Sequence, residues 1–338
     1  MTVVSTRRMP GEWEHHSATW IFWPTSAERY VYGSLASFAE VRSAFVCLID
    51  VLSAFEPVYL GVDPTVIEEA KAAVGRRATI HEIPMDDAWA RDTAPTFILE
   101  NGHPEAICWR FAGWGGRFEP YAKDAKAAAS VAEIMNVDHF SSPLELEGGA
   151  INSDGRGSLL TTAPVLNDPR RNHGQDSGFC EAALQEALGV SRLIALPAGF
   201  SGDDTGGHVD VVATFDPLGR VLLNHCKDWN DPNSGGTADN ATFLKDLEIE
   251  VIRIPQPAAE FFGNGRLPFS YLNHYLCNDG LILPRFGDKK DDYVRDLMAE
   301  VYPDRDMVQF DARPFYSGGG GLHCVTQPVF SGKAYFDQ

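Results

Sequence analysis

The sequence lacks a long apolar run and an apolar N-terminal segment, and each absence excludes a class of protein. Its 338 residues contain no uninterrupted apolar stretch of about 18 residues, the length that a membrane-spanning helix requires. The N-terminal stretch MTVVSTRRMPGEWEHH shows no apolar core of the kind found in secretory signals. We therefore expect a cytoplasmic protein without a membrane partner.

Cysteines are few and show no pairing. The six cysteines stand at 47, 108, 180, 226, 277 and 324, and no two of them form a CxxC pair. This spacing disfavours both a disulfide framework and a zinc site. Five of the six have apolar neighbours, which predicts reduced side chains in the core, and Cys324 is the exception.

Positive charge is also scarce. Lys and Arg number 28 against 47 Asp and Glu, which gives a formal net charge of −19 at pH 7. A negative field repels the phosphates of nucleic acids and attracts cations, so we expect no nucleic-acid partner. Two interpretations of the acidity stay open: it concentrates a small cationic substrate, or it only maintains solubility.

Neither a long linker nor a low-complexity run divides the chain, and 44% of its residues are hydrophobic. Predicted strands alternate with predicted helices throughout, so we expect one α/β domain over residues 1–338. The clearest predicted helices span 35–52, 121–135, 176–188, 240–247 and 290–301. Strands are expected at 158–162, 209–215, 271–276 and 322–330, and a loop tip at 231–236.

The segment 316–327 reads YSGGGGLHCVTQ, in which four consecutive glycines precede a leucine, a histidine and Cys324. Glycine suits places where the backbone takes positive φ or lies against a ligand, and such a run weakens a core. A flexible loop is the alternative, but the apolar residues that follow predict an ordered strand. The thiol is therefore a candidate nucleophile, provided that other segments supply its base and charged partners.

A second motif, DDAWARD at 86–92, places charge between two apolar strands. Loops at strand ends are where α/β proteins carry their chemistry, and a solvated turn seldom also needs a tryptophan. Trp89 and Asp92 are therefore candidate site residues, with a plain turn as the alternative.

A third motif, GDDTGGHVD at 202–210, combines glycines with an imidazole and a carboxylate. If 209–215 is a strand, His208 and Asp210 project from the same face, because side chains alternate along a strand. A lone histidine is more often structural, but this glycine-flanked position at the start of a strand favours function.

Together these motifs supply a thiol, an imidazole, carboxylates and an indole, a set that suits a guanidinium. Two aspartates can bind its nitrogens, a thiolate can attack its central carbon, and an imidazolium can protonate the departing nitrogen. Zinc-dependent hydrolysis is the competing chemistry. It is disfavoured because the sequence has no His-x-x-x-His motif and no second Cys-His set, so we expect no metal.

Eight ordered motifs carry a resemblance to a known family: GEWEHHSATWIFWP, DDAWARDTAPTF, FAGWGG, LEGGAINSDGRGSLLTT, GDDTGGHVD, RLPFSYLN, ILPRFGD and GGGGLHCVTQ. They span nearly the whole chain, which resembles the agmatine deiminase and bacterial-type peptidylarginine deiminase family of guanidine-modifying enzymes. The resemblance implies a five-module α/β propeller, the pentein fold, with pseudo-fivefold symmetry. It also implies a site at the hub and no metal or other cofactor.

The resemblance assigns roles to individual residues. It implies that Cys324 is the nucleophile, that His208 is the general acid and base, and that Asp92 and Asp210 bind the guanidinium. For the agmatine-specific branch it further implies an indole wall and acidic groups near the amine end of the substrate, at Trp89, Glu147 and Asp204.

The expected function is therefore that of an agmatine deiminase, which forms N-carbamoylputrescine and ammonia through a covalent thiouronium on Cys324. Two alternatives stay open. One is a deiminase of peptidyl-arginine or of another guanidino compound, and the other, from a different class, is a non-catalytic protein that binds guanidines or polyamines. The expected partner is a small cationic guanidino substrate, and assembly into a homo-oligomer stays open.

Overall fold

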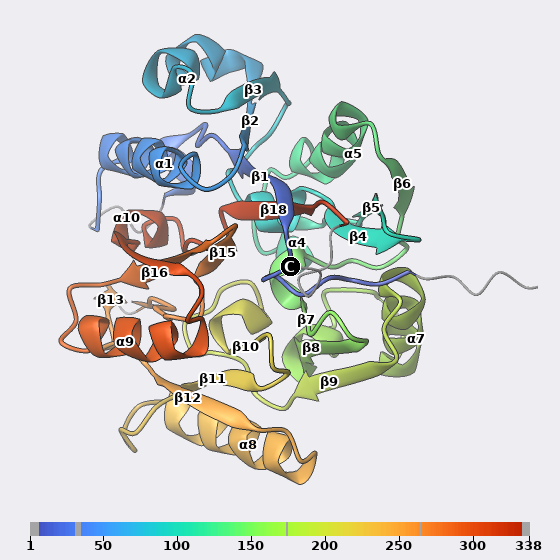
Figure 1. The fold of residues 1–338 in the computed structure, drawn as a ribbon, viewed down its shortest axis with the longest axis vertical. Coiled ribbons are helices and arrows are strands. Elements are labelled where there is room, and N and C mark those ends of the chain that lie inside the picture. Colours follow the sequence, from blue (N-terminus) through green and yellow to red (C-terminus); the bar gives the residue numbers. More distant parts are fainter. Residues whose placement is uncertain (1–6, 31–34, 174, 264, 333–338) are drawn as a thin grey trace, which may run out of the picture.

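The structure is a computed structural model that describes residues 7–30, 35–173, 175–263 and 265–332. Figure 1 traces the chain from the N-terminal part in blue to the C-terminal part in red. Residues 1–6 belong to the stretch on which the expected lack of a secretory signal depends, and they lie outside the described ranges. Within these ranges, no helix is long and apolar enough to cross a membrane.

Four three-stranded sheets repeat one pattern along the chain. In each, the strands follow one another in sequence, the first pair is antiparallel and the second pair is parallel. A parallel pair requires a crossover, and in each sheet helical segments supply it. The sheets are β4 (Thr96–Glu100), β5 (His103–Cys108) and β6 (Asp138–Ser141); β7 (Asn152–Ser153), β8 (Ser158–Thr162) and β9 (Arg192–Leu196); β10 (Ala213–Phe215), β11 (Val221–His225) and β12 (Val251–Pro255); and β15 (Tyr275–Cys277), β16 (Gly280–Arg285) and β17 (Asp306–Asp311).

A fifth sheet joins the two ends of the chain. Its strand order is β18 (Thr326–Phe330), β1 (His16–Phe22), β2 (Val58–Val62) and β3 (Thr79–Glu82). β1 pairs antiparallel with β18 and parallel with β2, the same pattern as in the other four sheets. This pairing brings β18, which follows Cys324 in the sequence, beside the N-terminal strand β1 (Figure 1).

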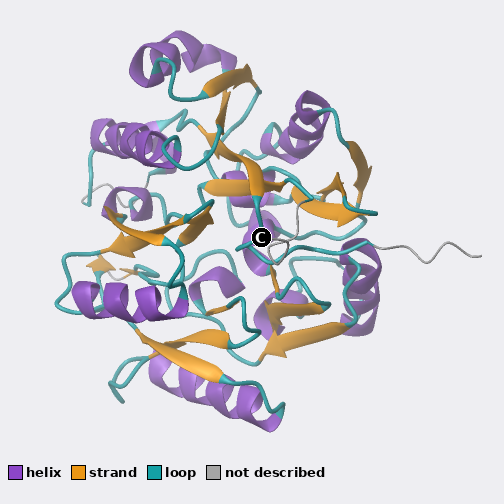
Figure 2. Ribbon diagram, viewed as in Figure 1, coloured by secondary structure: helices purple, strands orange, loops and turns teal. Residues whose placement is uncertain are grey.

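The longer helices lie on the outside of the molecule, as Figure 2 shows. In α1, a capping box between Ser37 and Glu40 begins the helix, and Val41, Phe45 and Leu48 are fully buried on one face. The longer helices are α1 (Phe38–Leu52), α2 (Ile67–Val74), α5 (Asp124–Met135), α7 (Ser177–Leu188), α8 (Asn233–Asp246) and α9 (Asp291–Val301). Short segments are η1 (Ala27–Arg29), η2 (Pro64–Val66), α3 (Ala90–Thr93), α4 (Gly113–Gly116), η3 (Gly148–Ala150), α6 (Ala163–Leu166), η4 (Val209–Val211) and α10 (Arg313–Tyr316), with a hairpin of β13 (Phe261–Phe262) and β14 (Gly265–Arg266).

The predicted strand at 209–215 is wrong in its first half. The segment begins as the 3₁₀ turn η4 and becomes extended only in β10. Gly206 and Gly207, both at positive φ, direct the chain into this turn. Strand alternation therefore does not place His208 and Asp210 on one face, and the turn sets their directions instead.

Two other predicted strands are shorter than expected. The segment 322–330 opens with a turn that contains Cys324, and β18 begins after it. The segment 271–276 opens with a turn in which the backbone N–H of Asn273 donates to the carbonyl of Ser270 at 3.3 Å, and β15 begins after it. In both places, residues with strand propensity are held in a turn that precedes the strand.

Two further predictions need correction. The segment 231–236 is not a loop tip but leads into α8, where the Asp231 carboxylate accepts the backbone N–H of Asn233 at 2.9 Å. Cys47, expected in the core, is exposed on α1, whereas the other cysteines are buried. The predicted strand 158–162 is confirmed, and the helix predicted at 176–188 is confirmed to within one residue.

Candidate active site

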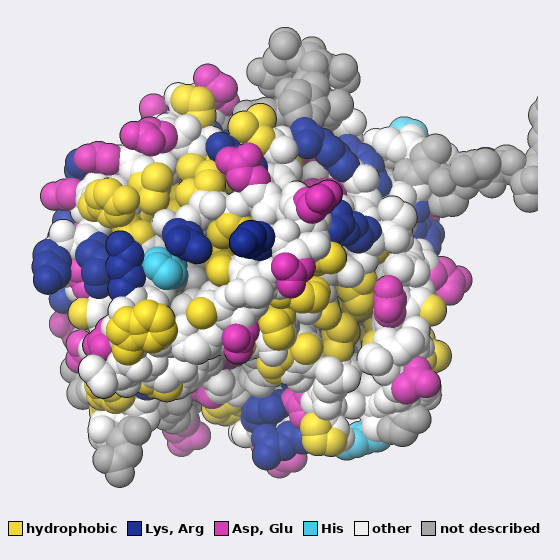
Figure 3. Space-filling view, turned by 90° about the horizontal axis from the view of Figure 1, so that it is seen from below, with side chains coloured by type: hydrophobic (Ala, Val, Ile, Leu, Met, Phe, Trp, Pro, Cys, Tyr) yellow, Lys and Arg dark blue, Asp and Glu magenta, His cyan; other side chains and the backbone are white. Residues whose placement is uncertain are grey.

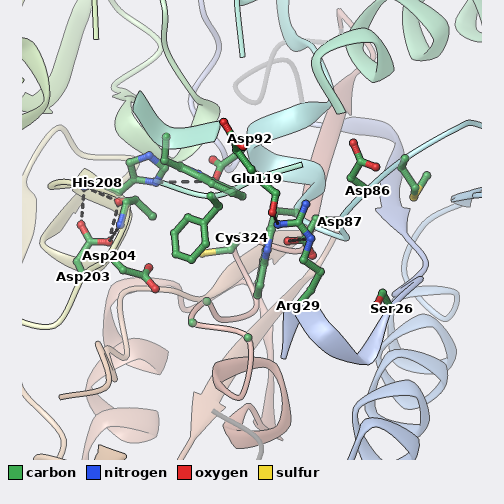
Figure 4. Close-up of a pocket in the computed structure, with 18 of the residues that line it drawn as sticks. Ser26, Arg29, Asp86, Asp87, Asp92, Glu119, Asp203, Asp204, His208 and Cys324 are labelled. Carbon is green, nitrogen blue, oxygen red and sulfur yellow. Dashed lines mark hydrogen bonds and ion pairs between the residues drawn. The ribbon is translucent and has the colours of Figure 1, made fainter. Parts of the chain in front are cut away.

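A cavity of about 440 Å³ lies where the motifs meet. Figure 4 shows Cys324 near its middle, with His208 and Asp204 on one side and Arg29 and Asp87 on the other. Of the seven site residues that the sequence predicts, the following six line the cavity: Trp89, Asp92, Asp204, His208, Asp210 and Cys324.

Cys324 lies in the turn before β18, and the residue is 8% exposed. Its Sγ accepts a hydrogen bond from Nδ2 of Asn273 at 3.2 Å and lies 3.5 Å from Oδ2 of Asp210. Burial, followed by the charges of Asp210 and Asp92, raises the pKa of the thiol well above its usual range. Without substrate, the side chain is therefore a neutral thiol at neutral pH.

The glycine run before Cys324 is required by the close approach of an indole. A Cβ added to Gly320 would lie 2.6 Å from Cζ3 of Trp89, and one added to Gly318 would lie 2.9 Å from Cζ2 of the same ring. A larger residue at either position would displace the tryptophan. The run therefore lets Trp89 lie against the segment that carries the thiol, where both line the cavity.

Asp92, in the short helix α3, is fixed by donors from two other segments. Its Oδ2 accepts a hydrogen bond from Nε1 of Trp114 at 2.9 Å, and its Oδ1 accepts one from the backbone N–H of Gly149 at 3.0 Å. Burial raises the pKa of Asp92; His208 opposes this shift, and Glu147 adds to it. A bound cation would therefore stabilise the charged form of this carboxylate.

His208 is buried, and its two ring nitrogens have different surroundings. Nε2 lies 3.3 Å from Oε2 of Glu147, whereas Nδ1 lies 3.9 Å from Oδ2 of Asp92 and makes no hydrogen bond within the described residues. Burial opposes charge on the ring, but Asp92 and Glu147 outweigh it and raise the pKa of His208 to about 9. At neutral pH, His208 is therefore an imidazolium whose Nδ1 proton is available to a ligand.

The second glycine of the LEGGA motif, Gly149, lies where there is no space for a side chain. A Cβ at this position would lie 2.6 Å from Nδ1 of His208 and 3.0 Å from carboxylate oxygens of both Asp92 and Asp210. Only a residue without a side chain fits among these three groups. The motif therefore allows the imidazole and the two carboxylates to converge.

Asp210 completes the set around the sulfur. Its Oδ2 lies 3.0 Å from Nδ1 of His323, as well as near Cys324. Burial opposes its ionisation, but the hydrogen bond and charge of His323 outweigh burial and lower the pKa of Asp210. Both of these contacts use the same carboxylate oxygen, and Asp210 lines the cavity.

Glu147 does not line the cavity, although the sequence places it near the amine end of a substrate. Its carboxylate accepts hydrogen bonds from Nε of Arg171 at 3.1 and 3.2 Å, and it contacts His208 from behind. Glu147 and Arg171 are both 1% exposed in their side chains. The carboxylate of Glu147 therefore contacts Arg171 and His208 and does not line the cavity.

The loop before His208 is organised by Asp203. One carboxylate oxygen accepts the backbone N–H groups of Gly207 at 2.8 Å and His208 at 2.9 Å, and the other accepts that of Thr205 at 2.9 Å. The next residue, Asp204, lines the cavity. Of the two acidic groups that the sequence assigns to the amine end of the substrate, only Asp204 is in a position to contact a ligand.

At the far side of the cavity the protein holds a guanidinium of its own. Nε of Arg29 lies 3.8 Å from Oδ2 of Asp87, and its Nη atoms donate to the carbonyls of Glu119 and Pro120. Burial raises the pKa of Asp87 to about 6, although Arg29 opposes the shift. These contacts hold Arg29 at the wall of the cavity, beside the carboxylate of Asp87.

Acidic residues dominate the lining of the cavity. The carboxylates outnumber the cationic side chains Arg29, Lys123 and His208: they are Glu28, Asp86, Asp87, Asp92, Glu119, Asp203, Asp204 and Asp210. On the face seen in Figure 3, by contrast, acidic side chains are scattered among basic and hydrophobic ones. This distribution favours the interpretation in which acidity attracts a cation. Within the described ranges, no group of three or more His, Cys, Asp or Glu side chains is arranged to hold a metal ion.

Sequence reasoning missed several residues that shape the site. Five of them lie in motifs that carry the resemblance, but their residue types alone indicated no role. Their partners come from distant segments, which spacing along the chain does not reveal. The missed residues are Glu12, Arg29, Arg91, Trp114, Arg171, Asn273 and His323.

Comparison with known proteins agrees with this geometry. The family profile of Porphyromonas-type peptidyl-arginine deiminases matches residues 8–329. A Streptomyces avermitilis protein is 35% identical over 334 residues, which cover 95% of this chain and 96% of that protein. A Legionella pneumophila protein is 34% identical over 328 residues, which cover 94% of this chain and 93% of that protein. Both carry the provisional name agmatine deiminase.

A solved structure shows the same fold. It is described as the agmatine deiminase of Enterococcus faecalis catalysing its reaction, and it superposes with a TM-score of 0.89 at 28% identity. The match covers 96% of this chain and 95% of that one. The α/β class predicted from the sequence is therefore confirmed.

Proposed function

Because the chain belongs to the family of Porphyromonas-type peptidyl-arginine deiminases, we propose that it is an agmatine deiminase. In this reaction agmatine and water give N-carbamoylputrescine and ammonia. The observation that carries the proposal is the convergence of the Cys324 thiol, the His208 imidazolium and the carboxylates of Asp92 and Asp210 in one acidic cavity. The provisional names of the two curated relatives support agmatine as the substrate.

The guanidinium of the substrate would lie between Asp92 and Asp210. Carboxylates bind its planar N–H groups, and the indole of Trp89 offers a flat wall for the cation. Asp204 would pair with the amine at the other end of agmatine, since it lines the same cavity. A carboxylate there disfavours substrates whose far end is neutral or anionic.

Binding of the cation would activate the nucleophile. An opposite charge within about 4–6 Å lowers the pKa of an acid by about 1–3 units. The Cys324 proton would then pass to water, and the thiolate would attack the guanidinium carbon, which forms the S–C bond. His208 Nδ1 would give its proton to one amino nitrogen, the C–N bond would break, and ammonia would leave a cationic thiouronium on the sulfur.

The second half of the reaction would reverse the role of His208. Now neutral, the imidazole would take a proton from a water molecule as its oxygen attacks the thiouronium carbon. The C–S bond would then break, and the remaining hydroxyl proton would pass to the departing thiolate, which gives the ureido product, with its oxygen from water, and regenerates the Cys324 thiol. Glu147 would hold Nε2 throughout, so that Nδ1 alone exchanges protons.

A substrate panel tests the proposal. Purified protein is incubated with agmatine, free arginine and an arginine-containing peptide, and both ammonia and the ureido product are measured. We expect the highest kcat/KM with agmatine and equal amounts of the two products. Preference for the peptide would instead favour a peptidyl-arginine deiminase, the description that the family carries. Binding of agmatine without turnover would favour a non-catalytic binding protein.

We also infer that the five sheets of three or four strands are the modules of a pentein propeller within one domain over 1–338. The shared pattern of an antiparallel pair followed by a parallel pair supports this inference. Closure of the chain through β1 and β18 supports it as well. Location in the cytoplasm stays a prediction from the sequence.

A further inference from the structure

His323 lies between two carboxylates behind the cavity. Its Nδ1 is 3.0 Å from Oδ2 of Asp210, and its Nε2 is 2.8 Å from Oε1 of Glu12. An ionised carboxylate can only accept hydrogen bonds, and a neutral imidazole can donate from only one nitrogen. With both carboxylates ionised, His323 must therefore carry a proton on each ring nitrogen. The side chain is 4% exposed, so this charge is buried.

The charges around His323 balance. Nη1 of Arg91 donates to Oε1 of Glu12 at 3.0 Å, and both side chains are buried. Burial opposes the ionisation of Glu12, but His323 and Arg91 outweigh burial and lower its pKa. Two cations thus face two anions, Glu12 and Asp210, and a buried charge is stable when it is paired in this way.

The same group fixes the backbone of the nucleophile. Nε of Arg91 donates to the carbonyl of His323 at 3.3 Å, and the backbone N–H of Arg91 donates to the carbonyl of Cys324 at 3.1 Å. The backbone N–H of His323 donates to Oδ1 of Asn273 at 3.1 Å, and Nδ2 of Asn273 contacts the sulfur. His323 is therefore tied to the thiol through both its ring and its main chain.

We propose that His323 is a positioning residue of the deimination reaction, a permanent imidazolium that keeps Asp210 ionised and directed toward the guanidinium. The proposal rests on the proposed function. His323 exchanges no proton during turnover, in contrast to His208. Without the charge of His323, the pKa of Asp210 would be higher, so Asp210 would already be protonated at a pH where it is now ionised. Its proton would then be shared with the sulfur of Cys324, which lies 3.5 Å away. The titratable and charged groups that face the His323 ring and its partners are Glu12, Arg91, His208, Asp210, His274 and Cys324.

Two variants separate the charge of His323 from its packing. His323→Gln removes the cation. Glu12→Gln combined with His323→Gln also removes the anion opposite, keeps the net charge and leaves two amides that can hydrogen-bond to each other. In the double variant, the two amides can therefore restore a hydrogen bond between positions 12 and 323, but they do not restore the cation beside Asp210.

The readout is the dependence of kcat/KM for agmatine on pH. We expect its acid limb to move to higher pH by about one unit or more in both variants, a loss of about tenfold at a fixed pH on that limb. His16→Gln is the matched control, because His16 is also buried and lies 3.2 Å from a carboxylate, that of Glu56, away from the cavity. This control should lower stability and leave the acid limb in place.

An unmoved acid limb in active His323 variants would overturn the proposal, as would full recovery of the wild-type profile in the double variant. If the variants do not fold, neutron diffraction of the wild-type protein decides the question. Deuterons on both ring nitrogens of His323 at neutral and mildly alkaline pH are expected, and a deuteron on only one nitrogen would refute the imidazolium. That measurement needs no turnover, so it is independent of the agmatine assay.

Discussion

The sulfur of Cys324 lies 3.5 Å from a carboxylate oxygen of Asp210, so the proposed nucleophile faces a negative charge when no substrate is bound. The same carboxylate would bind the substrate, and the substrate is a cation. In the proposed mechanism this geometry would couple binding to activation, because a bound guanidinium would offset the negative charge of the carboxylates that raises the pKa of the thiol. Such coupling would protect the thiol from adventitious electrophiles in the resting enzyme.

The first prediction concerns the ionisation of this thiol. We expect the Cys324 thiolate of the free protein to form only at strongly alkaline pH, because burial, Asp210 and Asp92 all oppose its charge. The ultraviolet absorbance of the thiolate, measured as wild type minus Cys324→Ala, isolates it from the other cysteines. Thiolate absorbance already present at neutral pH would contradict substrate-assisted activation.

The second prediction concerns the covalent step. Cys324→Ala should fold normally and show no turnover of agmatine, because the variant lacks the atom that bonds to the guanidinium carbon. Wild-type protein stopped with acid during turnover should carry added mass on the peptide that contains Cys324. Cys47→Ala is the control, since Cys47 is exposed on α1, and it should keep full activity. An adduct on another cysteine would overturn the mechanism.

The third prediction concerns His208. Because its pKa is raised to about 9, the ring stays protonated up to that pH, and kcat/KM should fall as pH rises through about 9. His208→Gln should lose about 100-fold or more in kcat, the usual contribution of general acid catalysis. Glu147→Gln removes an anion that raises the pKa of His208, so in this variant the alkaline limb of kcat/KM should move to lower pH. An alkaline limb that stays in place in Glu147→Gln would show that Glu147 does not act on His208.

The fourth prediction concerns Gly149. A methyl group 2.6 Å from Nδ1 of His208 must displace the ring or the loop, so Gly149→Ala should lose about 100-fold in kcat/KM, as expected for a misplacement of about 1 Å. Gly235→Ala is the matched control: its Cβ would meet no atom within 4 Å, and its position in α8 favours alanine. Equal activity in the two variants would argue against close convergence at Gly149.

The fifth prediction concerns substrate choice. Asp204→Asn should lower the ratio of kcat/KM for agmatine over free arginine by about tenfold or more, the contribution of one charged hydrogen bond. Glu147→Gln should leave that ratio unchanged, because Glu147 pairs with Arg171 and does not line the cavity. A changed ratio in Glu147→Gln and an unchanged one in Asp204→Asn would reverse the two assignments.

The sequence by itself determined the chemical groups and their family. Glycine-flanked motifs singled out Cys324, His208, Asp92 and Asp210, because runs of glycine beside reactive side chains conflict with a packed core. Alternation of helix and strand patterns predicted the α/β class, and the local signals for α1 and α7 placed those helices nearly correctly. These features depend on residue type and on neighbours close in sequence, so they are readable without coordinates.

Only the tertiary structure decided which of these groups work together. The resemblance implies that Glu147 lies near the substrate, whereas in the structure its carboxylate contacts Arg171 and His208. The segment directly after His208, expected as a strand, begins with the turn η4. His323 precedes the nucleophile in sequence, yet its ring meets Asp210, 113 residues away, and Glu12, 311 residues away. Hydrogen bonds between such distant segments depend on how the five sheets meet, and no spacing or propensity along the chain encodes that meeting directly.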